Sequence, residues 1–140
     1  AKASAEKLLQ APLQEGDILS SWEALEKYLH VAMAHAPIEQ VRVLFLNSKN
    51  RLRADEVMWD GSVDESAVHV REIIKRAIAL NATALIIVHN HPSGDPTPSS
   101  QDIALTRELI DAARPMKIAV HDHVIVGTSG RSSLRAMGLI

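Results

Sequence analysis

Residues 84–92 read ALIIVHNHP, a run of apolar residues that ends abruptly in two histidines and a proline. A short, continuous apolar run is typical of a strand that is buried on both faces of a sheet. Three prolines and one glycine lie between His89 and Pro98, and they predict a loop directly after this strand. Ser99 then begins a helix that we expect to end at about Ala113. The centre of the fold is therefore predicted to be a strand, a loop and a helix in succession.

The sequence on either side of this unit predicts further helices and strands. A helix is expected between a capping-box pattern at Ser20 and Glu23 and the proline at position 37, because apolar residues recur there at helical spacing. Residues 64–80 have the spacing of an amphipathic helix. Extended runs predict strands at 38–46, 52–59, 117–121 and 123–126. We therefore predict an α/β fold of the α+β type, in which helices flank a mixed β-sheet.

Length and composition indicate one domain, since 46% of the 140 residues are hydrophobic. We assign residues 20–140 to this domain and residues 1–19 to a linker or N-terminal arm. The 15 basic and 17 acidic residues give a net charge of −2, which argues against direct nucleic-acid binding by this domain. No apolar run predicts a membrane span and no leader-like segment is recognised, so we expect no membrane partner and a cytoplasmic protein.

The residues after the buried strand have the pattern of a metal site. Side chains two apart on an extended backbone point to the same side, so His89 and His91 can reach one point in space. Asp102 falls in the first turn of the following helix, where its carboxylate can complete the site. Two imidazoles and one carboxylate are the ligand count typical of catalytic zinc, which keeps a fourth position for water. The chain has no cysteine, so thiolate ligands are excluded.

Each part of this pattern also has a simpler explanation. A pair of histidines can be the polar end of a strand, and Ser99 with Asp102 can be a helix cap. Taken together, however, they have no economical packing explanation, and we interpret them as a metal site. Hydrolysis at such a site needs a general base, for which a carboxylate is suited. Residue chemistry alone leaves five candidates open, namely Glu39, Asp55, Glu56, Asp60 and Glu65. For His69, His121 and His123 we expect structural roles, because no spacing ties them to the metal site.

The motif His-x-His-Pro, six residues, Ser-x-x-Asp resembles the JAMM signature of MPN-domain metalloproteases. The chain is more similar still to the RadC family, from about Ser20 to Ile140. The segments that carry this similarity are 41–47 (VRVLFLN), 61–62 (GS), 68–72 (VHVRE), 89–95 (HNHPSGD) and 122–127 (DHVIVG). One departure is Val70, where RadC-like sequences usually have proline. No helix-hairpin-helix region, which full-length RadC-like proteins usually carry, is recognised in these 140 residues.

The resemblance implies a JAMM/MPN-like, cytidine deaminase-like fold that holds one Zn²⁺ ion per chain. It also implies that Glu39, eight residues before the Asn47 that ends the first strand, is the catalytic base. Ser99 would then donate a hydrogen bond to the oxyanion of the reaction. Our first hypothesis is a zinc-dependent metallopeptidase or isopeptidase that acts on a peptide or protein substrate. The alternatives are a DNA-repair-associated accessory protein with a regulatory or vestigial metal site and, ranked last, an inactive MPN-type interaction scaffold.

Overall fold

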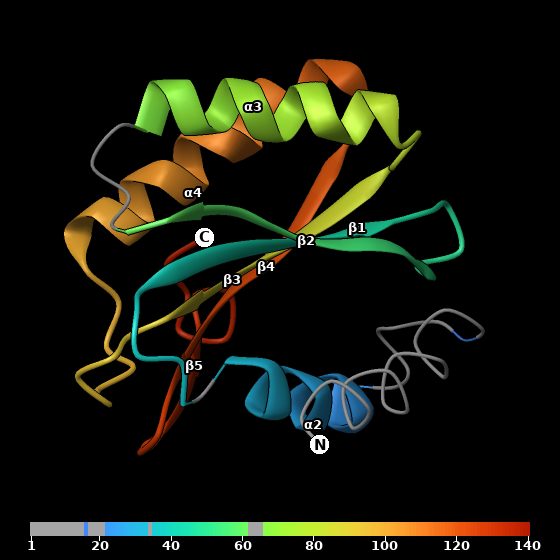
Figure 1. Ribbon diagram of the computed structural model, residues 1–140. Helices are drawn as coiled ribbons and strands as arrows, with labels where there is room; N and C mark the ends of the chain where they lie inside the picture. The colour runs from blue at the N-terminus through green and yellow to red at the C-terminus, as the bar shows by residue number, and fades with distance from the viewer. Residues whose placement is uncertain (1–15, 17–21, 34, 62–65) are drawn as a thin grey trace.

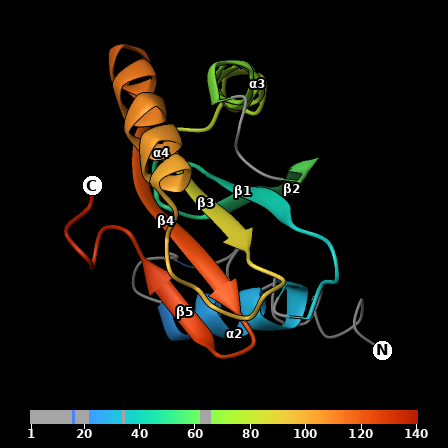
Figure 2. The same cartoon turned by 90° about the vertical axis from the view of Figure 1, so that its left-hand side faces the viewer.

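The computed structural model describes Gly16 and residues 22–33, 35–61 and 66–140. In these ranges a mixed β-sheet lies between helices, with α3 and α4 on one face and α2 on the other (Figures 1 and 2). The helices are α2 (Trp22–Met33), α3 (Ser66–Ala79), α4 (Ser100–Ala113) and the 3₁₀ helix η1 (Arg114–Met116). The strands are β1 (Gln40–Leu46), β2 (Leu52–Asp60), β3 (Ala84–Asn90), β4 (Ala119–Gly127) and β5 (Gly130–Ser133). The predicted α+β class and mixed sheet are confirmed.

Strand β3 is the centre of the sheet, as its apolar sequence predicts. The strand order is β2-β1-β3-β4-β5, with β3 and β4 parallel and the other pairs antiparallel. Every residue of β3 is buried, and successive side chains enter opposite cores. Ile86 and Val88 pack in the core beneath α2, whereas Leu85 and Ile87 pack in the core beneath α3 and α4. Both ends of β3 are thereby fixed within the molecule.

The end of the chain differs from the prediction of two strands at 117–121 and 123–126. Residues 119–127 form one strand, and the pairing with β3 shifts register at His121, where a bulge replaces the expected break. Asp122 remains inside the strand because its carboxylate accepts hydrogen bonds from the backbone N–H groups of His123 and Arg135, at 2.8 and 3.1 Å. The short strand β5, at the edge of the sheet, was not predicted.

Some parts of the prediction concern residues outside the described ranges. Ser20, the predicted cap of the first helix, is one of them, as is all of the predicted arm at 1–19 except Gly16. The prediction that residues 1–19 form a separate arm therefore stays a prediction. Among the described residues, no helix combines the length and the apolar character needed to cross a bilayer.

A buried polar network ties α2 to the first hairpin. Asp55 of β2 accepts hydrogen bonds from the hydroxyl of Tyr28 and from Nη1 of Arg42, the latter at 3.0 Å. The side chains of Arg42 and Asp55 are 13% and 2% exposed, so this ion pair is largely removed from water. Asp55, one of the five carboxylates considered as the base, therefore serves a structural contact between α2, β1 and β2.

Candidate metal centre

The histidines and the aspartate come from two elements that the fold brings together. His89 lies at the end of β3, and His91 follows it at the start of the loop, where its backbone N–H donates to Val126 O at 2.9 Å. Asp102 is the third residue of α4, and a capping box fixes it there. The Ser99 hydroxyl accepts from Asp102 N at 3.1 Å, and Asp102 Oδ2 accepts from Ser99 N at 2.8 Å. The helix cap considered from sequence is thus present, and it orients the carboxylate of Asp102.

The three predicted ligands lie close together around Asp102. Its Oδ1 is 3.1 Å from His89 Nδ1, and its Oδ2 is 3.4 Å from His91 Nε2. The two imidazole rings are nearly perpendicular, with centroids 4.9 Å apart. The structure therefore brings the predicted trio into one cluster. Their role as metal ligands stays a prediction.

A hydrogen bond to the backbone determines the tautomer of His91, that is, which of its two ring nitrogens carries the proton. His91 Nδ1 is 3.0 Å from the backbone carbonyl of Asp95. A carbonyl can only accept, so Nδ1 carries the proton, and in the neutral ring Nε2 holds the lone pair. This backbone contact is of the type that orients histidine ligands in metalloproteins.

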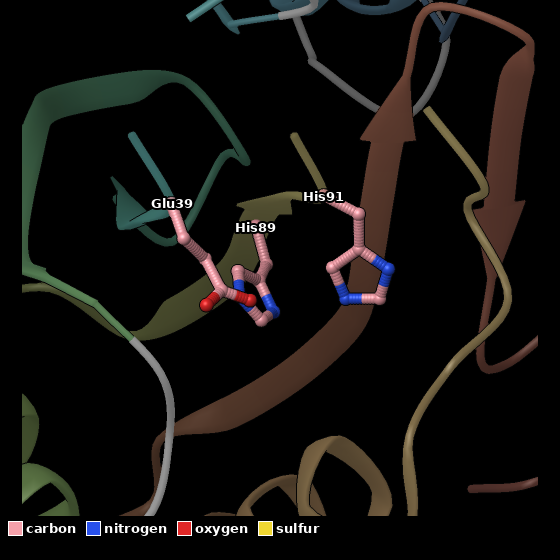
Figure 3. Close-up of side chains that lie close together, drawn as sticks. All are labelled: Glu39, His89 and His91. Carbon is pink, nitrogen blue, oxygen red and sulfur yellow. The ribbon is translucent and has the colours of Figure 1, made fainter. Parts of the chain in front are cut away.

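Glu39 lies on the other side of His89. Its Oε1 is 2.8 Å from His89 Nε2, and Figure 3 shows its carboxylate beside the ring of His89, with His91 on the far side of that ring. The Glu39 side chain is 30% exposed, so solvent can reach it. Among the other candidate bases, Asp55 and Glu56 are engaged elsewhere, with Arg42 and Arg76, whereas Glu65 lies outside the described residues.

Asn90 positions the segment that carries Glu39. Its side chain accepts from Gln40 N at 2.6 Å and donates to Ile38 O at 3.0 Å, which brackets Glu39 on both sides. The alternation of a strand places Asn90 on the face opposite His89 and His91. The sequence analysis did not identify this role, because the partners are about 50 residues away along the chain.

The cluster includes a further histidine that was not predicted. Two groups have one possible ligand atom per residue within 4.8 Å of one another. One consists of Glu39, His89 and His91; the other of His89, Asp102 and His123. His123 had been assigned a structural role because no motif spacing links it to His89. In the pairing of β3 with β4, His123 lies opposite Ile87, which is two residues before His89. His123 and His89 are therefore on the same face of the sheet.

The other two histidines of unknown role do have structural contacts. His69 stacks on Trp59, with ring centroids 3.6 Å apart, and His121 Nε2 is 2.8 Å from the side-chain oxygen of Asn50. Neither belongs to the two clusters found among the described residues.

The ionisation of the cluster suits metal binding. Burial lowers the pKa of His123 to about 3, and nearby His89 adds to this shift, whereas Asp102 opposes it. His123 is therefore neutral at pH 7, the form that can ligate a metal. Burial raises the pKa of Asp102, but contact with His89 and the N–H of Ser99 outweigh it and hold that pKa well below the usual range. The centre thus combines neutral imidazole with an ionised carboxylate.

Three buried atoms in this cluster lack a hydrogen-bond partner among the described residues. Their chemistry indicates whether a cation would fit among them. They are His89 Nδ1, Asp102 Oδ1 and His123 Nε2. Although the first two are 3.1 Å apart, they do not meet in hydrogen-bond geometry. Leaving a buried polar group without a partner costs about 1–3 kcal/mol. A cation bound among them would satisfy all three, and a set of imidazole nitrogens with one carboxylate suits zinc better than magnesium or calcium.

The loop between His91 and Asp102 is fastened to the turn after β4. The backbone oxygen of Gly94 accepts from the Ser129 hydroxyl and from Ser129 N, the latter at 3.3 Å. A Cβ added at Gly127 would lie 2.3 Å from Gly94 O and 2.8 Å from Gly94 C. Contacts this short are not tolerated, so the loop can approach β4 this closely only because residue 127 is a glycine.

Replacement of Gly127 by alanine should therefore displace the loop and weaken the metal centre. We expect a loss of about 1–3 kcal/mol in the free energy of unfolding, because an inserted methyl group must push the backbone apart. Zn²⁺ affinity, measured by isothermal titration calorimetry, should fall as well. In Gly138→Ala the added methyl meets open space, although φ is +74°, so that variant should lose stability but keep its Zn²⁺ affinity. Equal Zn²⁺ affinities in the two variants would contradict this prediction.

The fold and the cluster together define a class of protein: an α+β domain with a candidate metal centre where its central strand meets a helix N-terminus. A family model described as the RadC-like JAB domain matches residues 19–139 of the 140-residue chain. The chain therefore belongs to the RadC-like JAB domain family. The resemblance found from the motifs is confirmed, and the mixed sheet with its helices agrees with the JAB/MPN fold.

Proposed function

We propose that this domain is a zinc-dependent hydrolase, a metallopeptidase or isopeptidase that cleaves an amide bond in a peptide or protein substrate. The observation that carries the proposal is the placement of a solvent-accessible carboxylate beside the candidate metal centre. Glu39 Oε1 lies 2.8 Å from His89 Nε2, while the other nitrogen of the same ring faces Asp102. Membership of the RadC-like JAB domain family supports it.

Zinc held by His89, His91 and Asp102 would polarise the carbonyl group of the substrate and lower the pKa of a water molecule to roughly 7. The carboxylate of Glu39 would accept a proton from the attacking water and return it to the nitrogen of the leaving amine. A carboxylate suits both steps because it changes protonation state readily within an active site. Its exposure allows water and substrate to approach from the solvent side.

Ser99 has a hydroxyl proton available for the reaction. Its Oγ accepts from Asp102 N, so the helix cap uses a lone pair and leaves the O–H free to donate. The hydroxyl would then donate to the substrate oxygen as that oxygen gains negative charge, a contribution typical of oxyanion donors. The cap and the catalytic role of Ser99 are therefore compatible.

A screen of peptide and isopeptide substrates with the wild type and Glu39→Gln tests the proposal. We expect Glu39→Gln to retain zinc, measured by plasma mass spectrometry, and to lose roughly 10²–10⁴-fold in turnover, as expected for removal of a general base. Glu72→Gln is the matched control, because Glu72 is an exposed glutamate on α3, and it should behave as the wild type. Equal turnover in the wild type and Glu39→Gln, or zinc binding with no hydrolysis of any substrate, would refute the proposal. Strong DNA binding at physiological salt would favour the DNA-repair accessory role instead.

A further inference from the structure

The position of His123 raises the question of what this buried side chain binds. Its exposure is 0%, and it lies on β4, which pairs with the central strand β3. Its ring centroid is 5.9 Å from that of His89, and both side chains project from the same face of the sheet. Helix α4 covers this face, and Thr106 of α4 contacts His123 there. His123 is therefore a fully buried member of the cluster, whereas Glu39 is partly exposed.

Thr106 fixes the tautomer of His123. The Thr106 hydroxyl lies 2.7 Å from the backbone oxygen of Asp102 and 2.7 Å from His123 Nδ1. A hydroxyl has one proton, and a carbonyl oxygen can only accept, so Thr106 donates that proton to Asp102. The hydroxyl must then accept from His123, which places the ring proton on Nδ1. The lone pair of the imidazole is consequently on Nε2.

His123 Nε2 has no hydrogen-bond partner among the described residues. His123 belongs to the group in which one possible ligand atom each of His89, Asp102 and His123 lie within 4.8 Å of one another. Ordinary packing offers no compensation for a buried, unpartnered lone pair beside a carboxylate, whereas a cation would. A histidine whose other nitrogen is hydrogen-bonded to a neighbouring group also has the usual arrangement of a metal ligand.

We propose that His123 is a further ligand of the metal ion, which it binds through Nε2 together with His89 and Asp102. This inference rests on the metal binding in the proposed function but not on hydrolysis. It places the ion toward the interior of the cluster, with Thr106 as the residue that orients the new ligand. Glu39 lies on the other side of the His89 ring, beside Nε2, where it is partly exposed to solvent.

Metal titration of four proteins tests the inference without any measurement of turnover. Zn²⁺ affinity is measured by isothermal titration calorimetry. Co²⁺ is used as a second probe because its visible absorption spectrum depends on its ligands, whereas Zn²⁺ has no such spectrum. The proteins are the wild type, His123→Leu, Thr106→Val and the control His121→Leu. Thr106→Val keeps the imidazole and the side-chain shape, so it remains informative even where His123→Leu folds poorly.

We expect Thr106→Val to lose about 10–100-fold in Zn²⁺ affinity, the usual effect of removing a group that orients a ligand. His123→Leu should lose more, and its Co²⁺ spectrum should change. His121→Leu, altered two residues away on the same strand, should match the wild type in both. Wild-type affinity and spectrum in His123→Leu would overturn the inference, as would a wild-type protein that binds neither metal. A protein that binds metal through His123 but hydrolyses no substrate would refute only the proposed function.

Discussion

His89→Ala should reduce the metal content of the protein from about one zinc ion per chain to near zero. His89 is the residue that both clusters among the described residues share. One of its nitrogens faces Asp102 and the other faces Glu39, so its removal opens the centre from both sides. With this side chain absent, each group keeps two of its three possible ligands, and the centre loses the residue that the two groups share. Plasma mass spectrometry of protein purified without chelator measures the effect.

The matched control for this prediction is His69→Ala. His69 stacks on Trp59 and lies outside both clusters, so its loss should leave the zinc content unchanged. A zinc content that fell equally in both variants would point to a general effect on folding. Undiminished zinc in His89→Ala would show that the ion binds elsewhere, and the proposed hydrolase mechanism would then lose its basis.

Asp55→Ala should have the largest effect on stability, a loss of about 3–5 kcal/mol in the free energy of unfolding. The substitution removes a carboxylate that is 2% exposed and leaves the guanidinium of Arg42, 13% exposed, without its counter-ion. A buried charge that loses its partner retains the cost of leaving water without the compensating attraction. The Tyr28 hydroxyl, which also donates to Asp55, loses the same acceptor. Urea unfolding followed by circular dichroism measures the change.

Glu56→Ala is the control, because it removes the neighbouring carboxylate of β2 from an ion pair at the surface. The side chains of Arg76 and Glu56 are 44% and 30% exposed, and two hydrogen bonds of 2.7 Å join them. Pairs of this kind contribute about 1 kcal/mol or less. If Asp55→Ala cost no more than Glu56→Ala, the buried network would not be the anchor between α2 and the hairpin that we describe.

The elements that could be predicted from sequence are those with a strong local signal. The apolar run at 84–88, the helical spacing around α2 and the cap at Ser99 each correspond to an observed element. The break expected at Asp122 was wrong because that carboxylate is satisfied by Arg135 and Ser133, which lie beyond the strand. Long-range hydrogen bonds of this kind leave no periodic pattern in the sequence, so a polar residue in mid-strand looks like a loop.

The same distinction separates the predicted and missed parts of the centre. His89, His91 and Asp102 lie within 14 residues and form a motif. His123 is brought to them only by the pairing of β3 with β4, and its link to Thr106 depends on how α4 packs on the sheet. The sequence signal that could have pointed to it is an unexplained histidine after an aspartate in the last long strand, within the segment 122–127 that carries the family resemblance.

The contacts of Asn90 limit how this domain can change over time. Residues 89–91 present imidazole, amide and imidazole to alternate faces, and the amide holds the backbone on both sides of Glu39. Insertion or deletion of one residue here would exchange the faces, sending an imidazole toward α2 and the amide into the metal centre. The proposed ligands and the proposed base therefore depend on the alternation of side chains along this strand. Changes in chain length are therefore expected in the loops and not in this strand, because an insertion in a loop does not exchange the faces of the sheet.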